Sequence, residues 1–142
     1  MGYTHYWRGG KVDADVWTKI TTDVNKLIEQ SEVPLQHEYD EPGTKPLVNE
    51  ETIFFNGAGD DGHETFFIKP TGTDFEFCKT AYKPYDKIVT AVLAVIKEHA
   101  GDAIRVSSDG DEKDWQEGLA YAKKVLGRDV AYPIKHYENG DF

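Results

Sequence analysis

Three lysines are spaced by four residues around a junction between a predicted strand and a predicted helix, and this spacing has a clear chemical use. They are Lys79, Lys83 and Lys87, and the helix is expected to begin near Pro84 and Tyr85. The N–H groups at a helix N-terminus attract anions, and an aromatic ring beside them can stack a base. The junction therefore indicates a phosphate or nucleotide site, although a solvated helix start with lysine stems lying along the surface gives the same pattern.

The opening segment, residues 2–8, is the second candidate for binding chemistry, because it holds two tyrosines, a histidine and a tryptophan within five residues. Strand alternation divides its side chains into two sets, with Tyr3, His5 and Trp7 on one side and Thr4, Tyr6 and Arg8 on the other. The aromatic set could stack a ligand. It could equally be the inward side of a core strand whose polar tips find partners within the protein.

A few further polar residues could complete such a site. Arg105 could meet a phosphate, and Ser107 and Asp109 could offer a hydroxyl and a carboxylate to a ribose or an amino group, although turn and capping roles explain these two residues as well. Asn56 and His63 flank a predicted hairpin turn and could fix polar edges of a ligand.

Catalytic patterns are absent from the sequence. None of the five histidines pairs with another at i, i+4, and His63-Glu64 fails as the start of a zinc-binding helix because residue 67 is Phe. There is no Gly-x-Ser-x-Gly motif, and Cys78, within a predicted strand, has the setting of a small core residue. We therefore expect no catalytic residue, no metal site and no cofactor.

Charge is distributed unevenly. The net charge is −10, and residues 37–64 hold eight acidic residues against one base, Lys45. This distribution is typical of a solubilising loop, and the alternative is an acidic surface that imitates nucleic acid. Direct binding of nucleic acid is disfavoured because the chain has no basic stripe.

Length and hydropathy limit the classes of protein to which the chain can belong. The chain has 142 residues, which fits a single α+β domain spanning 1–142, and its one cysteine excludes an internal disulfide. The N-terminus has no apolar signal sequence, and no segment reaches the roughly 18 apolar residues of a membrane span. We therefore expect a cytoplasmic protein without a membrane partner.

Hydrophobic periodicity predicts eight elements in the order β-α-β-β-β-α-β-α. Strands are expected at 2–8, 52–56, 63–69, 75–80 and 103–107, and helices at 13–30, 85–100 and from a cap at Ser108 or Asp111 to Gly127. Asp13 is the expected N-cap of the first helix. Residues 31–50 read as a long loop with a short extended piece near Leu35 or Leu47, and the tail either adds a strand at 130–134 or packs loosely. Together these elements favour an α+β fold, a mostly antiparallel five-stranded sheet with three helices on one face.

Several short motifs resemble a family of small proteins encoded by bacteriophages and prophages. They are Met1-Gly2-Tyr3-Thr4-His5-Tyr6-Trp7, Phe55-Asn56-Gly57, Gly62-His63-Glu64-Thr65-Phe66, Phe77-Cys78-Lys79-Thr80-Ala81, Lys83-Pro84-Tyr85-Asp86 and Val106-Ser107-Ser108-Asp109-Gly110. The resemblance spans nearly the whole chain. It implies a phage accessory protein in the cytoplasm of an infected bacterium. By analogy it extends to counter-defence proteins that sequester the nucleotide signals of immune systems such as Thoeris and CBASS.

The leading hypothesis is therefore a protein that binds and sequesters a nucleotide-derived small molecule without catalysis. Its expected ligand-binding residues are Tyr3, His5, Trp7, Arg8, Asn56, His63, Lys79, Lys83, Tyr85, Arg105, Ser107 and Asp109. Two alternatives stay open: an acidic protein that inhibits a host enzyme, and a nucleotide-degrading hydrolase that uses His63 and Glu64. Assembly with further copies of the same chain is open as well.

Overall fold

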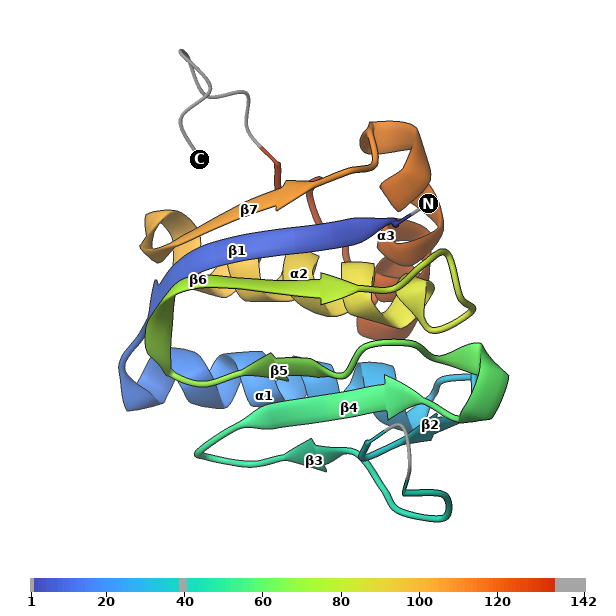
Figure 1. Ribbon diagram of the computed structural model, residues 1–142. Helices are drawn as coiled ribbons and strands as arrows, with labels where there is room; N and C mark the ends of the chain where they lie inside the picture. Colours follow the sequence, from blue (N-terminus) through green and yellow to red (C-terminus); the bar gives the residue numbers. More distant parts are fainter. Residues whose placement is uncertain (1, 39–40, 135–142) are drawn as a thin grey trace.

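The computed structural model describes residues 2–38 and 41–134 and contains three α-helices and seven strands within them (Figure 1). Their bounds are β1 Thr4–Lys11, α1 Ala14–Glu29, β2 Leu35–Gln36, β3 Leu47–Val48, β4 Ile53–Gly57, β5 Phe66–Ile68, β6 Thr71–Lys79, α2 Asp86–Ala100, β7 Ile104–Ser108 and α3 Glu112–Leu126. The five expected strands and three expected helices are all present in the expected order. One short extended piece was expected near Leu35 or Leu47, and the structure has a two-residue strand at each of these places, β2 and β3.

The helix boundaries follow from local capping. The side chain of Asp13 accepts a hydrogen bond from the backbone N–H of Val16 and so caps α1. Asp111 and Asp114 form a reciprocal capping box at the start of α3. Both caps confirm the sequence prediction. Helix α2 ends at Gly101, whose φ of 57° lies in the region that glycine adopts without strain.

The strands form two antiparallel sheets, which corrects the expectation of one five-stranded sheet. In the first sheet β1 lies between β6 and β7, and in the second β4 pairs with β2, β3 and β5. Figure 1 shows the strands side by side in one layer, with α1 and α2 behind them. The first sheet is centred on β1, the strand nearest the N-terminus, so it forms only when residues 60 or more positions apart in the sequence pair with each other.

The two sheets are joined near Glu64, which precedes β5, and Lys79, the last residue of β6, because the backbone N–H of Glu64 donates to the carbonyl of Lys79 at 3.1 Å. The backbone N–H of Lys79 donates to Oε1 of Glu64 at 2.6 Å. The buried hydroxyl of Tyr85 donates to the carbonyl oxygen of Glu64. These bonds connect the segment before β5 to the end of β6, although β5 and β6 are not paired as strands.

The core lies between the strands and the helices. The central stretch of α2, from Ile88 to Ile96, is buried at every position, which confirms the prediction that this helix is the most buried element. It is covered by the apolar stripe of α1, by Trp115 of α3 and by the inward side chains of β1 and β7. Beyond α3, residues 128–134 form no strand, although Val130 is buried against the core. Within the described ranges, no helix is long and apolar enough to cross a membrane.

Candidate functional site

The side of the first sheet that points away from the helices carries a group of aromatic and basic side chains. We call this side the outer face and define it by Tyr6 and Arg8 of β1, Phe75 and Phe77 of β6, and Arg105 and Ser107 of β7. Strand register places Tyr6 between Phe77 and Ser107, and it places Arg8 opposite Arg105. The outer face is therefore an ordered arrangement of side chains fixed by backbone pairing.

The aromatic part of the outer face is exposed. Phe75 and Phe77 retain 46% and 47% of their accessible surface, which is unusual for phenylalanine. The ring of Tyr6 is stacked on that of Phe75 with centroids 6.0 Å apart, and the two phenylalanine rings are 6.2 Å apart. Three neighbouring rings therefore offer a contiguous apolar platform to solvent.

The basic part of the outer face adjoins this platform. Arg8 and Arg105 are both exposed and are direct partners across β1 and β7. The guanidinium carbon of Arg8 lies 6.0 Å from the ring centroid of Phe75, a cation–π contact. Arginine side chains bind anions with paired N–H donors, and the register places two of them at neighbouring positions of this face.

Asp109 lies at the end of β7 beside the hydroxyl of Tyr6. Its Oδ1 accepts a hydrogen bond from this hydroxyl at 3.0 Å, and its Oδ2 accepts one from the backbone N–H of Thr4 at 3.0 Å. Partial burial and then the neighbouring Asp109 raise the pKa of Tyr6, so the phenol stays neutral and donates. Thr4 of β1 lies between Asp109, which bonds to it after β7, and Lys79, which pairs with it on β6.

The structure brings five of the twelve expected residues to this surface, namely Arg8, Lys79, Arg105, Ser107 and Asp109. Four others, Tyr3, His5, Trp7 and Tyr85, are at most 1% exposed. This corrects the expectation that these four stack or orient a ligand. The physical reason is strand alternation: one strand cannot present both Trp7 and Arg8 on the same side, and the core takes the side with Trp7.

The buried His5 is the centre of a polar network that was not predicted from the sequence. Its Nε2 lies 2.6 Å from Oδ1 of Asp86, and its Nδ1 lies 2.8 Å from Oγ of Ser108. Thr80 donates a further hydrogen bond to the same oxygen of Asp86. A short-range pattern could not have revealed the group, because its members come from β1, the loop after β6, α2 and β7.

Ser108, His5 and Asp86 are linked by hydrogen bonds in the same order as the residues of a hydrolase triad, but the groups around them are those of a structural network. His5 is fully buried, and Oγ of Ser108 also accepts the N–H of Gly110. The neighbouring N–H of Asp109 is bonded to the carbonyl of Thr4, so neither of these two N–H groups can stabilise an oxyanion. The network therefore joins β1 and β7 to the start of α2.

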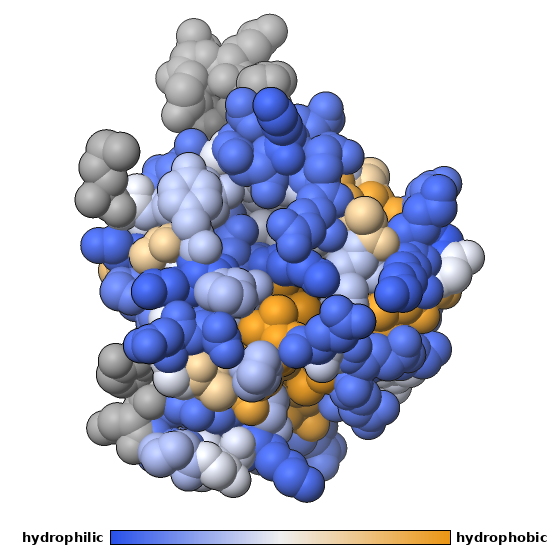
Figure 2. Space-filling model, turned by 90° about the vertical axis from the view of Figure 1, so that its right-hand side faces the viewer, coloured by the Kyte–Doolittle hydropathy of each residue, from blue (hydrophilic) through white to orange (hydrophobic). Residues whose placement is uncertain are grey.

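Lys83 lies apart from the outer face, in an open pocket of about 360 Å³ between α3 and the start of α2. The loop after β6, which carries Lys83, lies on the right-hand side of Figure 1. Figure 2 views the molecule from this side and shows a mostly hydrophilic surface with an apolar patch near its centre. Lys83, Lys87 and Lys113 line the pocket together with an equal number of acidic residues, Asp86, Asp114 and Glu117. This balance of charge gives the pocket no preference for an anion, so the expected phosphate site at the helix start is not supported.

Asn56 and His63 organise the connection between β4 and β5. The amide of Asn56 accepts from the N–H groups of Gly57 and His63, and it donates to the carbonyl of His63 and the hydroxyl of Thr65. Asn56 is fully buried, and its hydrogen bonds are to protein groups, whereas the side chain of His63 is exposed. Glu64, the partner of His63 in the hydrolase alternative, has its carboxylate bonded to the backbone of β6.

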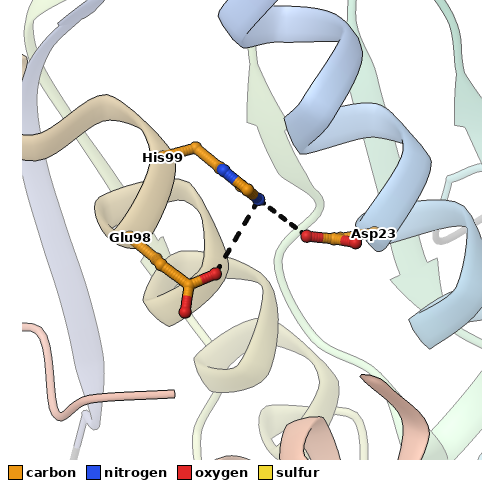
Figure 3. A group of neighbouring side chains, drawn as sticks. All are labelled: Asp23, Glu98 and His99. Carbon is orange, nitrogen blue, oxygen red and sulfur yellow. Dashed lines mark hydrogen bonds and ion pairs between the residues drawn. The ribbon is translucent and has the colours of Figure 1, made fainter. Parts of the chain in front are cut away.

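One group of side chains, on α1 and α2, has the composition of a metal site. Asp23, Glu98 and His99 converge, with His99 2.7 Å from Asp23 and 3.8 Å from Glu98 (Figure 3). The guanidinium of Arg128 already contacts both carboxylates, at 2.7 Å from Asp23. Since this guanidinium supplies the positive charge that the carboxylates need, the group joins α1 and α2 to the segment after α3.

Comparison of the chain with protein-family models, with curated proteins and with solved structures gives no match. The class that the fold and the site define is an α+β protein with an exposed aromatic and basic sheet face. Three of the residues that make this face, Tyr6, Phe75 and Phe77, were not among the expected site residues. The available signal was the outward set of β1, which placed Tyr6 beside Arg8.

Proposed function

We propose that this chain binds a nucleotide-derived small molecule on the outer face and sequesters it without converting it. One observation carries the proposal: exposed aromatic rings and two opposed arginines occupy neighbouring positions of a single antiparallel sheet. Aromatic rings on such a surface stack bases regardless of their identity, and arginines bind phosphate with paired N–H donors.

The dimensions of the outer face suit a nucleotide. Tyr6 and Arg8 are two residues apart on β1, a separation of about 7 Å along a strand. A base stacked on Tyr6 and Phe77 then has its phosphate within reach of Arg8 and Arg105. Ser107 lies beside Tyr6 and can bond a ribose hydroxyl.

Sequestration is favoured over catalysis by the kinds of groups on the outer face. Arginine, serine and phenylalanine bind and position a ligand, whereas His5 and Asp86 are committed to the buried network described above. The likeness to phage-encoded proteins supports the same proposal, with the cytoplasm of an infected bacterium as the place of action. No cofactor is part of it.

A small ligand fits this surface better than a nucleic-acid strand. Polyanion binding requires many lysines and arginines along a continuous track, and the chain carries a net charge of −10. The positive charge of the outer face comes from Arg8 and Arg105, with Lys79 at its far end. This is sufficient for one or two phosphates.

Calorimetry of the full chain against cyclic ADP-ribose isomers and cyclic oligonucleotides tests the proposal. We expect micromolar binding of at least one compound, and we expect Arg8→Ala/Arg105→Ala to weaken it at least tenfold. The matched control is Lys19→Ala/Lys26→Ala, which removes two exposed positive charges from α1 and should leave binding unchanged. Absence of binding to every compound at micromolar protein concentration overturns the proposal.

Two further measurements separate the alternatives. Chromatography of the ligand released by heating should show it intact, and a converted ligand would favour a hydrolase. An acidic inhibitor of a host enzyme should lose activity when Glu38, Glu41, Asp60 and Asp61 are neutralised, whereas sequestration should not change. Asp40, which belongs to the same acidic segment, lies outside the described residues.

A further inference from the structure

The carboxylate of Asp109 is held at the edge of the aromatic platform, and this position has a consequence for ligand choice. We infer that the outer face selects a base that carries an exocyclic amino group, as adenine and cytosine do, over a base with a carbonyl oxygen at that place. The inference rests on the proposed function and specifies its ligand class.

Asp109 is fixed by both its backbone and its side chain. Its backbone N–H donates to the carbonyl of Thr4, and its two carboxylate oxygens accept from Thr4 and Tyr6. Each carboxylate oxygen can accept two hydrogen bonds, so acceptor capacity is left over. Asp109 is exposed, and this remaining capacity faces solvent at the rim of the platform.

The hydrogen bond from Tyr6 defines where the carboxylate lies relative to a stacked base. Oδ1 of Asp109 is 3.0 Å from the hydroxyl at the tip of the Tyr6 ring. A base stacked on this ring, with its phosphate near Arg8, therefore directs the edge farthest from the phosphate towards Asp109. The amino groups of adenine and cytosine lie on their hydrogen-bonding edge.

A carboxylate discriminates at this edge because it only accepts hydrogen bonds. An amino group donates to it in a charge-assisted bond, whereas a carbonyl oxygen at the same place meets a negative charge. Lys79, which could donate to a carbonyl oxygen, is two strands away, about 10 Å across the sheet. It does not read the same atom of the base.

The test titrates the full chain with two pairs of nucleotides that differ at this group, AMP against IMP and CMP against UMP, with backbone amide shifts as the readout. We expect the amino member of each pair to bind about tenfold tighter, the size of one hydrogen bond to a charged group. In Asp109→Asn the difference should fall to about twofold or less, because an amide both donates and accepts. The control Asp15→Asn removes an exposed carboxylate from the first turn of α1 and should leave the preference intact.

A second variant tests the inference independently, in case Asp109→Asn does not fold. Tyr6→Phe keeps the ring for stacking but removes the hydroxyl that holds Asp109, so it should retain binding and lose part of the preference. Equal binding of both members of each pair, or tighter binding of the oxo member, overturns the inference while the proposed function stands. If none of the four nucleotides binds, the inference fails, and the calorimetry with cyclic ligands decides separately whether the proposed function fails with it.

Discussion

Nε2 of His5 lies 2.6 Å from Oδ1 of Asp86, and through this contact the opening strand is joined to the first turn of α2. A carboxylate only accepts, so Nε2–H is the donor in this contact, and Nδ1 forms a hydrogen bond of 2.8 Å with the hydroxyl of Ser108. Both ring nitrogens of His5 therefore have hydrogen-bond partners although the side chain is fully buried. Because β1 also carries Tyr6 and Arg8, the same contact helps to fix the strand that supports the outer face.

Replacing His5 should cost much more stability than replacing an exposed histidine. His5→Ala leaves polar groups of Asp86 and Ser108 without their partner and opens a cavity, so we expect a loss of about 2–4 kcal/mol in the free energy of unfolding. His37, which is half exposed and pairs with Glu41, is the control, and His37→Ala should cost less than about 1 kcal/mol. Urea unfolding followed by tryptophan fluorescence measures both. Similar losses in the two variants would contradict a structural role of the network.

Cys78 should be unreactive in the native protein. Burial raises the pKa of its thiol to about 12, and the thiol hydrogen bonds to the carbonyl of Glu64. Since only the thiolate reacts, we expect no modification by a disulfide reagent at pH 8 and complete modification in denaturant. Rapid labelling without denaturant would mean that β6 opens readily at this position.

The same burial predicts a loss of stability in alkaline solution. The pKa values of Cys78, Tyr3 and Tyr85 are raised, each chiefly by burial, above their ordinary values of 9.0 and 10.0. Groups with raised pKa values stabilise the fold fully below those ordinary values, and this contribution is lost as the pH rises above them. The free energy of unfolding should therefore fall steadily from about pH 9 upwards.

Asp23 should contribute the opposite dependence in acid. Burial alone would raise the pKa of this carboxyl, but the hydrogen bonds from His99 and Arg128 outweigh it and lower the pKa. A lowered pKa gives stability that is present above the ordinary value of 3.8 and is lost as the pH falls below it. Asp23→Asn should lose about 1 kcal/mol at pH 7, discounted for the partial exposure of Arg128, and it should show a flatter decline in acid. Denaturation at pH 7, 4 and 2.5 tests this, and parallel curves for the two proteins would refute it.

The sequence could predict features that depend on neighbouring residues. The caps Asp13 and Asp111 and the all-round apolar stretch of α2 are local signals, and the structure confirms each of them. The division into two sheets could not be predicted in this way, because it depends on hydrogen bonds between strands far apart in the sequence, such as those of β1 with β6 and β7. Such bonds form only in the folded chain.

The candidate site was only partly predictable, because some of its features follow from neighbouring residues and others from pairing between distant strands. Alternation along β1 correctly separates Trp7 from Arg8, but it does not tell which set faces the core. That choice is made by packing against α2 and by the accommodation of His5 beside Asp86. The pairing of Arg8 with Arg105, nearly a hundred residues later, depends on β1 lying between β6 and β7.

An alanine-to-glycine substitution should stabilise the protein in the loop after β6 and destabilise it within α3. Ala81 has a φ of 53°, in the left-handed region that disfavours every residue with a Cβ atom, and the following Tyr82 has a φ of 59°. Glycine relieves this strain, so Ala81→Gly should stabilise the protein by up to about 1 kcal/mol after the entropy of the unfolded chain is counted. Ala120, exposed within α3, is the matched control, and there the same change should destabilise by about 1 kcal/mol. Urea midpoints that fall in both variants would show that the backbone at Ala81 is not strained. Opposite shifts would show that the strained loop is held by its surroundings, among them the Tyr82 ring stacked 3.8 Å from that of Tyr3.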